Sequence, residues 1–127
     1  MDNYKVNDLS PGTLAFVGDA YFGLLVRTRL AEVNRPAGEL HSLSVKLVKA
    51  SAQAEGFAAI ENLLSEKETS VFKRGRNAHV NSVPKNASVR DYHIATGVEV
   101  LFGYLHLSGN NDRAAELFDI IWKTVFE

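Results

Sequence analysis

The 127-residue sequence predicts an all-α fold. Three serines, Ser10, Ser65 and Ser88, stand where the first turn of a helix needs a side-chain cap. After each of them, apolar residues recur at spacings of three and four, the period of one helix face. Internal repeats, low-complexity tracts and linkers are absent, so a single domain over residues 1–127 is expected.

The composition limits the class of protein further. With 46% hydrophobic and 23% charged residues, the chain can supply one globular core. A net charge of -1 excludes a globally basic nucleic-acid binder, although its 14 lysines and arginines can gather on one surface. There is no cysteine, no signal-peptide pattern and no apolar run long enough to span a bilayer. We therefore expect a cytoplasmic protein with no membrane partner.

The first half of the chain predicts two long helices. The first runs from Pro11 to about Leu30, because Ser10 can cap it and proline is tolerated at the first helical position. Residues 34–38 contain proline and glycine and should break the helix. Leucines at helical spacing then predict a second helix, which should continue through the alanine-rich stretch to about Leu64.

The second half predicts three helices. A capping box at Ser65 to Glu68 opens a short helix, and Ser88 caps a long one from Val89 to about Leu107. The last helix begins at Asp112. Its expected core residues are Leu117, Ile120, Ile121 and Val125, and its surplus apolar residues are Phe118, Trp122 and Phe126.

Two of these helices each carry a single carboxylate in apolar surroundings. Asp19 is the only charged residue between Pro11 and Val26, and Glu99 is the only formally charged one between Tyr92 and Asn111. A carboxylate in a core must be neutralised, paired with a cation or bound to a metal. The residues alone leave two interpretations: separate structural ion pairs or helix ends near water, and one shared site for a divalent cation such as magnesium.

A basic stretch lies between the two carboxylates in sequence. From Val71 to Arg90 there is no acidic residue, and the glycine, proline, serine and asparagines at its centre indicate a loop. Such a loop could reach phosphate oxygens with its cations, amides and polar side chains. The basic residues of the stretch, with its histidine, are Lys73, Arg74, Arg76, His79, Lys85 and Arg90.

Several motifs together resemble one family. LAFVGDAY at residues 14–21 is similar to the signature helix of the ribonuclease III catalytic domain, and TGVEVLFGY at 96–104 to its second metal-binding helix. ELHSLS at 39–44, RGRNA at 74–78 and VPKN at 83–86 are similar to the short bacterial branch without a double-stranded-RNA-binding domain. The resemblance covers residues 14–107 and implies a ribonuclease III catalytic-domain-like helical fold and a two-fold homodimer.

The resemblance also implies an activity and its metal. It implies magnesium-dependent hydrolysis of double-stranded RNA, leaving a 5′-phosphate and a 3′-hydroxyl, in maturation of the large-subunit ribosomal RNA precursor. It leaves open a ribosomal protein as a further partner. Asp19 and Glu99 match the catalytic and metal-binding acids, whereas Ala15 and Thr96 replace two further acids of the full-length enzymes. We therefore expect one firmly held magnesium ion, with any second ion recruited together with RNA.

The expected RNA contacts come from the basic loop and one helix edge. Recognition of A-form RNA should depend mainly on shape and backbone. The residues expected to bind RNA are Arg74, Arg76, Asn77, Lys85 and Asn86, with Lys46 and Lys49 as weaker candidates. Because two family carboxylates are missing, a catalytically silent helical dimer that binds structured RNA is the alternative. A helical nucleotide pyrophosphohydrolase would need clustered carboxylates, which neither lone acid has.

Overall fold

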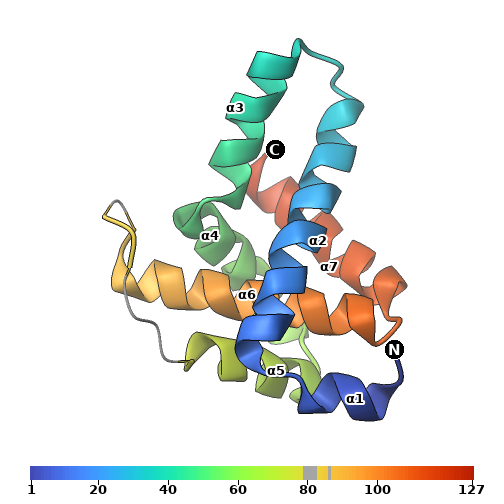
Figure 1. Cartoon of the computed structure of the whole chain (residues 1–127). Helices are drawn as coiled ribbons and strands as arrows, with labels where there is room; N and C mark the ends of the chain where they lie inside the picture. Colours follow the sequence, from blue (N-terminus) through green and yellow to red (C-terminus); the bar gives the residue numbers. More distant parts are fainter. Residues whose placement is uncertain (79–82, 86) are drawn as a thin grey trace.

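A computed structural model describes residues 1–78, 83–85 and 87–127, shown in Figure 1. The described residues form helices and no strand, which confirms the all-α prediction. The elements are α1 (Asn3–Asp8), α2 (Pro11–Ala31), α3 (Ala37–Val48), α4 (Ala50–Ile60), the short 3-10 helix η1 (Glu61–Leu63), α5 (Glu66–Arg76), α6 (Val89–Leu107) and α7 (Asn111–Val125). Among these helices, none has an apolar stretch long enough to cross a lipid bilayer.

The three predicted serine caps are all present. The Ser10 hydroxyl accepts a hydrogen bond from the backbone N–H of Thr13 at 3.1 Å, and the Ser88 hydroxyl accepts one from Asp91 at 3.0 Å. At the start of α5, Ser65 and Glu68 form the reciprocal capping box. These caps explain why the predicted starts of α2, α5 and α6 are correct.

The prediction of one continuous helix from about Leu40 to Leu64 is wrong. Lys49 is extended, with φ −66° and ψ 157°, and separates α3 from α4. The freed carbonyl of Val48 accepts a hydrogen bond of 2.8 Å from the Gln53 side chain. The break lets α3 pack on α2 while α4 turns to pack on α6 and α7. Local helix propensity at Lys49 and Ala50 is good, so this tertiary packing decides the break.

The N-terminal helix α1 was not predicted. It is only six residues long, and its start is capped by Asp2, whose carboxylate accepts a hydrogen bond from the backbone N–H of Lys5 at 3.0 Å. Val6 is fully buried and packs with Leu14 and Val71 in a small second core cluster. Burial of one apolar side chain against α2 and α5 therefore holds a helix too short for its periodicity to be recognised.

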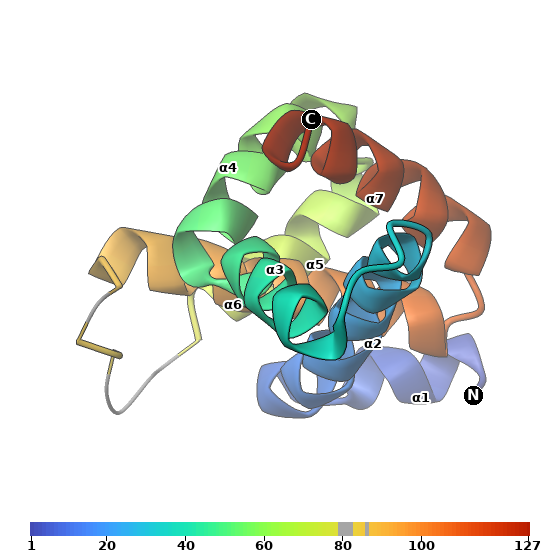
Figure 2. The same ribbon diagram turned by 90° about the horizontal axis from the view of Figure 1, so that it is seen from above.

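Helix α6 is the centre of the fold and packs against α2, α4, α5 and α7. In Figure 1, α2 crosses α6. The C-terminal half of α2 extends beyond this crossing and lies beside α3. Figure 2, viewed from above, shows α4 and α7 on one side of α6 and α1 on the other. Glu99 therefore lies on the helix that most of the other elements contact.

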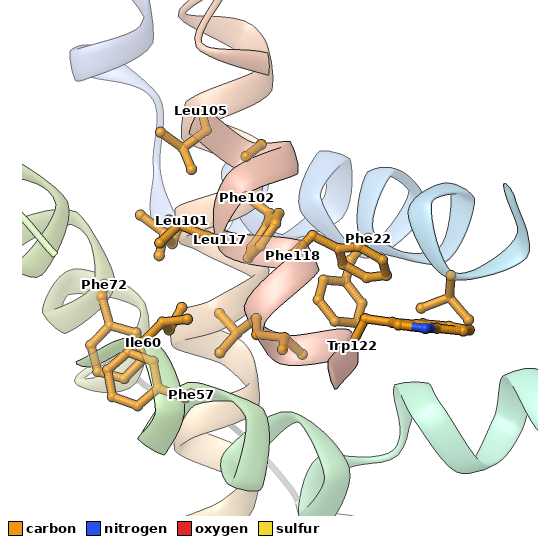
Figure 3. Packing of buried hydrophobic residues seen from close by; sticks show 14 of the residues in the cluster. Phe22, Phe57, Ile60, Phe72, Leu101, Phe102, Leu105, Leu117, Phe118 and Trp122 are labelled. Atoms are coloured by element: carbon orange, nitrogen blue, oxygen red, sulfur yellow. The ribbon is translucent and has the colours of Figure 1, made fainter. Parts of the chain in front are cut away.

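Aromatic residues fill the main core, shown in Figure 3. The ring of Phe22 meets those of Phe102 and Phe118 edge to face, with centroids 5.2 and 5.4 Å apart. Farther along the core, Phe57 and Phe72 are stacked at 3.9 Å. These contacts join α2, α4, α5, α6 and α7 around one set of buried rings.

The expected division of α7 into core and surplus residues is partly wrong. Leu117 and Ile121 are buried as predicted, but Phe118 and Trp122 are buried as well. Ile120 and Val125 are only half-buried and pack against the edge of the core. The larger rings occupy the centre because they face Phe22 and Arg29 of α2, whose guanidinium lies 5.3 Å from the Trp122 ring centroid.

Candidate catalytic site

The crossing of α2 and α6 brings Asp19 and Glu99 together. Gly18 and Gly103 form the crossing, where a Cβ on Gly18 would overlap the carbonyl of Glu99 and one on Gly103 would overlap that of Leu14. The two backbones therefore touch directly beside both acids. The Asp19 side chain lies within hydrogen-bonding reach of the Glu99 carboxyl, so two carboxyls 80 residues apart in sequence share one site.

The apolar neighbours of Asp19 in the sequence predicted that its carboxylate is buried, and this prediction is wrong. It is exposed, whereas Leu14, Gly18 and Phe22 form the inward face of α2. The neighbouring Phe16 is also 80% exposed. Apolar sequence around Asp19 therefore marks an uncovered apolar surface and not the interior of this chain.

Glu99 is the more buried member of the pair. Burial raises the pKa of Glu99 to about 8, and the hydrogen bond and negative charge of Asp19 act in the same direction. In the metal-free chain, Glu99 therefore carries a proton at neutral pH. A bound divalent cation would compete with this proton and favour two ionised carboxylates.

The donor set suits magnesium. Two carboxylates from two rigid helices match an ion that takes one or two protein carboxylates and fills its other positions with water and phosphate oxygens. Within the described parts of the chain, no three or more metal-ligating side chains come together. Ala15 and Thr96, which were expected to replace two further acids, supply no carboxylate, so Asp19 and Glu99 are the two carboxylates available to a metal at this crossing.

A cavity of about 400 Å³ extends from Glu99 along α6. Its walls come from the α3–α4 junction and from the start of α6. They include Lys49, Ser51, Gln53, Asp91 and Tyr92. Of these, sequence analysis selected only Lys49 as a binding residue. Tyr92 and Asp91 could have been found by stepping back from Glu99 by seven and eight residues on the same helix face.

Gln53 was missed for a different reason. Its side chain is 5% exposed and donates to the Val48 carbonyl, while its Oε1 has no hydrogen-bond partner among the described residues. It faces this cavity only because α4 begins anew after Lys49. Periodicity alone could not have identified it, because the break itself was not predicted.

The residues predicted to bind RNA do not form one cluster. Arg74 donates to the carbonyl of Leu9 at 2.9 Å, which ties α5 to the α1–α2 junction. With Lys73 and Asn77 it lines an open groove of about 700 Å³ on α5. Arg76 lines a different cavity beside Phe72. The prediction that the basic loop includes Arg74 and Arg76 is therefore wrong, because both belong to the last turn of α5, where they line different cavities.

The remaining predicted RNA contacts lie elsewhere. Lys85 is exposed, and Asn86 lies outside the described residues. Lys46 and Lys49 line a cavity of about 330 Å³ with Glu55 and the C-terminal Phe126. Lys49 also borders the cavity of Glu99, so of the described candidates it is the one that shares a cavity with Glu99.

A family model and several relatives match this chain in sequence. Residues 12–110 match the family model described as the ribonuclease III domain. The Mini-ribonuclease 3 of Thermoanaerobacter sp. (strain X514) is 44% identical over 123 residues, covering 96% of this chain and 87% of that protein. The Mini-ribonuclease 3 of Clostridium tetani is 37% identical over 118 residues, covering 91% and 78%.

A solved structure supports the same fold. The crystal structure of protein FN1578 from Fusobacterium nucleatum superimposes with a TM-score of 0.85 at 27% sequence identity. The match covers 91% of this chain and 93% of that chain. This likeness in fold accompanies the sequence match to the family.

The chain belongs to the ribonuclease III family, whose members are endoribonucleases. The family match includes both Asp19 and Glu99. Within the family, the chain falls in the Mini-ribonuclease 3 branch, with which it shares 32 to 44% identity over most of its length.

Proposed function

We propose that residues 1–127 act as one catalytic domain that cuts double-stranded RNA with the help of magnesium. The observation that carries the proposal is the meeting of Asp19 and Glu99 at the α2–α6 crossing. The product ends would be a 5′-phosphate and a 3′-hydroxyl. The name Mini-ribonuclease 3 of the relatives supports a ribonuclease role, and the large-subunit ribosomal RNA precursor is the substrate we propose in the cytoplasm.

In this proposal Asp19 and Glu99 hold the metal. When bound, magnesium would polarise the scissile phosphate and lower the pKa of a water that can attack it. The chain contributes ligand geometry, because the glycine contact between α2 and α6 fixes the distance between the two acids. Glu99 must give up its proton for the cation to bind, so acidic pH should weaken the site.

An uncovered apolar stripe on α2 supports a two-fold homodimer. Phe16 is 80% exposed and Leu24 is 60% exposed, and Ala20 lies between them on the same face of the helix. A second copy that covers this stripe would bury it. The same side of α2 carries Asp19, so a dimer through this face would bring two sites near one RNA duplex.

The RNA would be held mainly through its backbone. The proposed contacts are Arg74, Arg76, Asn77, Lys85, Asn86, Lys46 and Lys49. Lys49 has the strongest structural support, because it borders the cavity that contains Glu99. A ribosomal protein bound to the same precursor is the further partner we propose to test.

A cleavage assay tests the proposal. Purified protein is incubated with a duplex RNA and magnesium, and wild type is compared with Asp19→Asn and Glu99→Gln. The matched control is Asp112→Asn, at an exposed acid on α7. Both site variants should lose at least about a hundredfold in rate, since each removes a ligand charge, while the control should cut normally. If the wild type leaves duplex RNA intact, or both site variants cut as fast as it does, the proposal fails.

A further inference from the structure

A second charged cavity lies on another side of α6. It has a volume of about 270 Å³ and is enclosed by α4, α5 and the start of α6. Its chemistry comes from Glu61, Arg76, Arg90 and His93. His93 precedes Glu99 by six residues, so at about 100° per residue the two side chains leave α6 in different directions. This cavity is therefore separate from the one that contains Glu99.

The floor of the cavity is firmly packed. Phe57 and Phe72, which both line it, are buried and stacked with their ring centroids 3.9 Å apart (Figure 3). The guanidinium of Arg76 lies 5.9 Å from the Phe72 ring centroid. A stacked aromatic pair beneath an arginine gives the charged groups a fixed base, which reduces the entropy lost when a ligand binds.

Arg76 and Arg90 both have N–H donors that no acceptor among the described residues uses. Arg76 uses its Nε to donate to the Asn77 side chain at 3.2 Å, and among the described residues its terminal nitrogens have no acceptor. Arg90 is 79% exposed, and its one contact with an acid is a long 3.4 Å approach to Asp91. Guanidinium groups present N–H donors in a fork that matches phosphate oxygens.

His93 adds a third donor. Its Nδ1 is buried and has no hydrogen-bond partner in the described part of the chain. A proton on Nδ1 would be buried without an acceptor, so the neutral ring carries its proton on Nε2. In this tautomer Nε2 is the hydrogen-bond donor of the ring. His93 lines the cavity, so this donor is available to a ligand there.

From these observations we propose that the cavity binds a phosphate group. Two arginines line the cavity and outweigh Glu61, the one carboxylate among its lining residues, whereas Asp91 beside Arg90 lines the cavity of Glu99. The cavity can accept a phosphate together with a small apolar part of its carrier. The phosphate could belong to the backbone of bound RNA, in which case the inference rests on the proposed function. It could also belong to a free mononucleotide, in which case it does not.

Inorganic phosphate and adenosine 5′-monophosphate are the probes for the first experiment. Each is titrated into metal-free protein at constant ionic strength, and backbone amide NMR shifts give the site and its affinity. Arg90→Gln should weaken binding about tenfold, and Glu61→Gln should tighten it about threefold, because they remove charges of opposite sign. Arg35→Gln, at an exposed arginine between α2 and α3, should change nothing.

Duplex RNA distinguishes the two sources of phosphate. Asp19→Asn is used so that the RNA is not cut during the measurement. If the cavity holds a backbone phosphate, adding Arg90→Gln should reduce the steepness of the plot of log binding constant against log salt concentration by about one. An unchanged slope with weakened binding of the two small probes assigns the site to free nucleotides. Arg90 is chosen because it is outside the RNA contacts proposed above.

The inference is overturned if Arg90→Gln changes neither the affinity for the small probes nor the salt dependence of duplex binding. It is also overturned if Arg35→Gln weakens binding as much as Arg90→Gln does. Arg90 is exposed, so its variant should fold, and the NMR spectrum of each variant checks this directly. The titration with inorganic phosphate does not depend on RNA cleavage. The phosphate site can therefore be correct even if the cleavage assay shows no activity, and the two proposals can fail separately.

Discussion

Gly18 of α2 lies against the backbone of Glu99 in α6, with no space for a side chain between them. Gly103 repeats the arrangement one turn later against Leu14. This contact between two backbones sets the position of Asp19 relative to Glu99, because each acid is at or next to a contact residue. Packing and the candidate catalytic site therefore depend on the same two glycines.

Substitution of Gly18 by alanine should destabilise the fold strongly. A Cβ there would overlap backbone atoms, which cannot move aside as a flexible side chain can. We expect a loss of more than about 3 kcal/mol in the free energy of unfolding, measured with urea. The control is Gly38→Ala in α3, where a Cβ meets no atom within 4 Å and should stabilise the helix by about 0.5 to 1 kcal/mol. Equal effects of the two substitutions would contradict the close contact.

The ion pair between Glu68 and Arg113 should make the free energy of unfolding decrease at acidic pH. The Arg113 side chain donates to both carboxylate oxygens of Glu68 at 2.9 Å and to the carbonyl of Leu63 at 2.7 Å. These bonds hold the pKa of Glu68 below its usual range. The folded state thus binds this proton less readily than the unfolded chain does, so the stabilisation is present above the unfolded pKa of about 4.3 and is lost as pH falls through the lower folded value.

Arg113→Met tests this ion pair. It should cost about 3 kcal/mol at pH 7, because it leaves Glu68 in place without its partner, and it should reduce the loss of stability between pH 5 and about 3. Urea unfolding over this range measures both effects. Lys123→Met, at an exposed lysine that pairs with Asp119, is the control and should cost less than about 1 kcal/mol. A pH profile unchanged by Arg113→Met would show that other groups cause the acid dependence.

Glu99 should have the opposite effect on the pH dependence of stability from Glu68 in the metal-free chain. Its folded pKa of about 8 lies above the unfolded value of about 4.3, so its contribution to stability is full at low pH and is lost as pH rises from about 4.3 to about 8. Glu99→Gln should remove this part of the profile. Thermal unfolding in a chelating buffer is the measurement, and adding magnesium should restore stability to the wild type near pH 8. A variant with the wild-type profile would contradict the shifted pKa.

The exposed stripe on α2 should decide the oligomeric state. Phe16→Glu should convert a dimer into a monomer, because it places a charge in the apolar surface proposed to be covered. Tyr4→Glu is the control, since Tyr4 is 78% exposed and belongs to a different helix, α1. Sedimentation velocity measures both. A wild type that is monomeric at high concentration, or a Phe16 variant that remains dimeric, would show that this surface is not a dimer interface.

Much of the fold could be predicted because its helix starts are local. Ser10, Ser65 and Ser88 cap their own helices through hydrogen bonds to residues three positions ahead, so the sequence near each cap contains the information. The break at Lys49 depends instead on how α3 and α4 pack on different partners. Helix α1 likewise depends on burial of Val6 against distant residues.

The pairing of the two acids in the candidate site was predictable from the sequence, but the environment of each acid was not. Asp19 and Glu99 were found because charges are scarce in both helices, and the structure brings them together. The exposure of Asp19 was missed because an uncovered apolar face and a buried one have the same sequence pattern. Gln53 was missed because it faces the cavity beside Glu99 only after the break at Lys49, whereas the spacing of Tyr92 from Glu99 on α6 could have identified it.

Titration with manganese measures whether Asp19 and Glu99 together hold one divalent cation. The electron paramagnetic resonance signal of the free ion gives the number of ions bound and their affinity. We expect one bound ion per chain at pH 8 and at least about tenfold weaker binding in both Asp19→Asn and Glu99→Gln. Wild-type affinity in either variant would contradict this expectation.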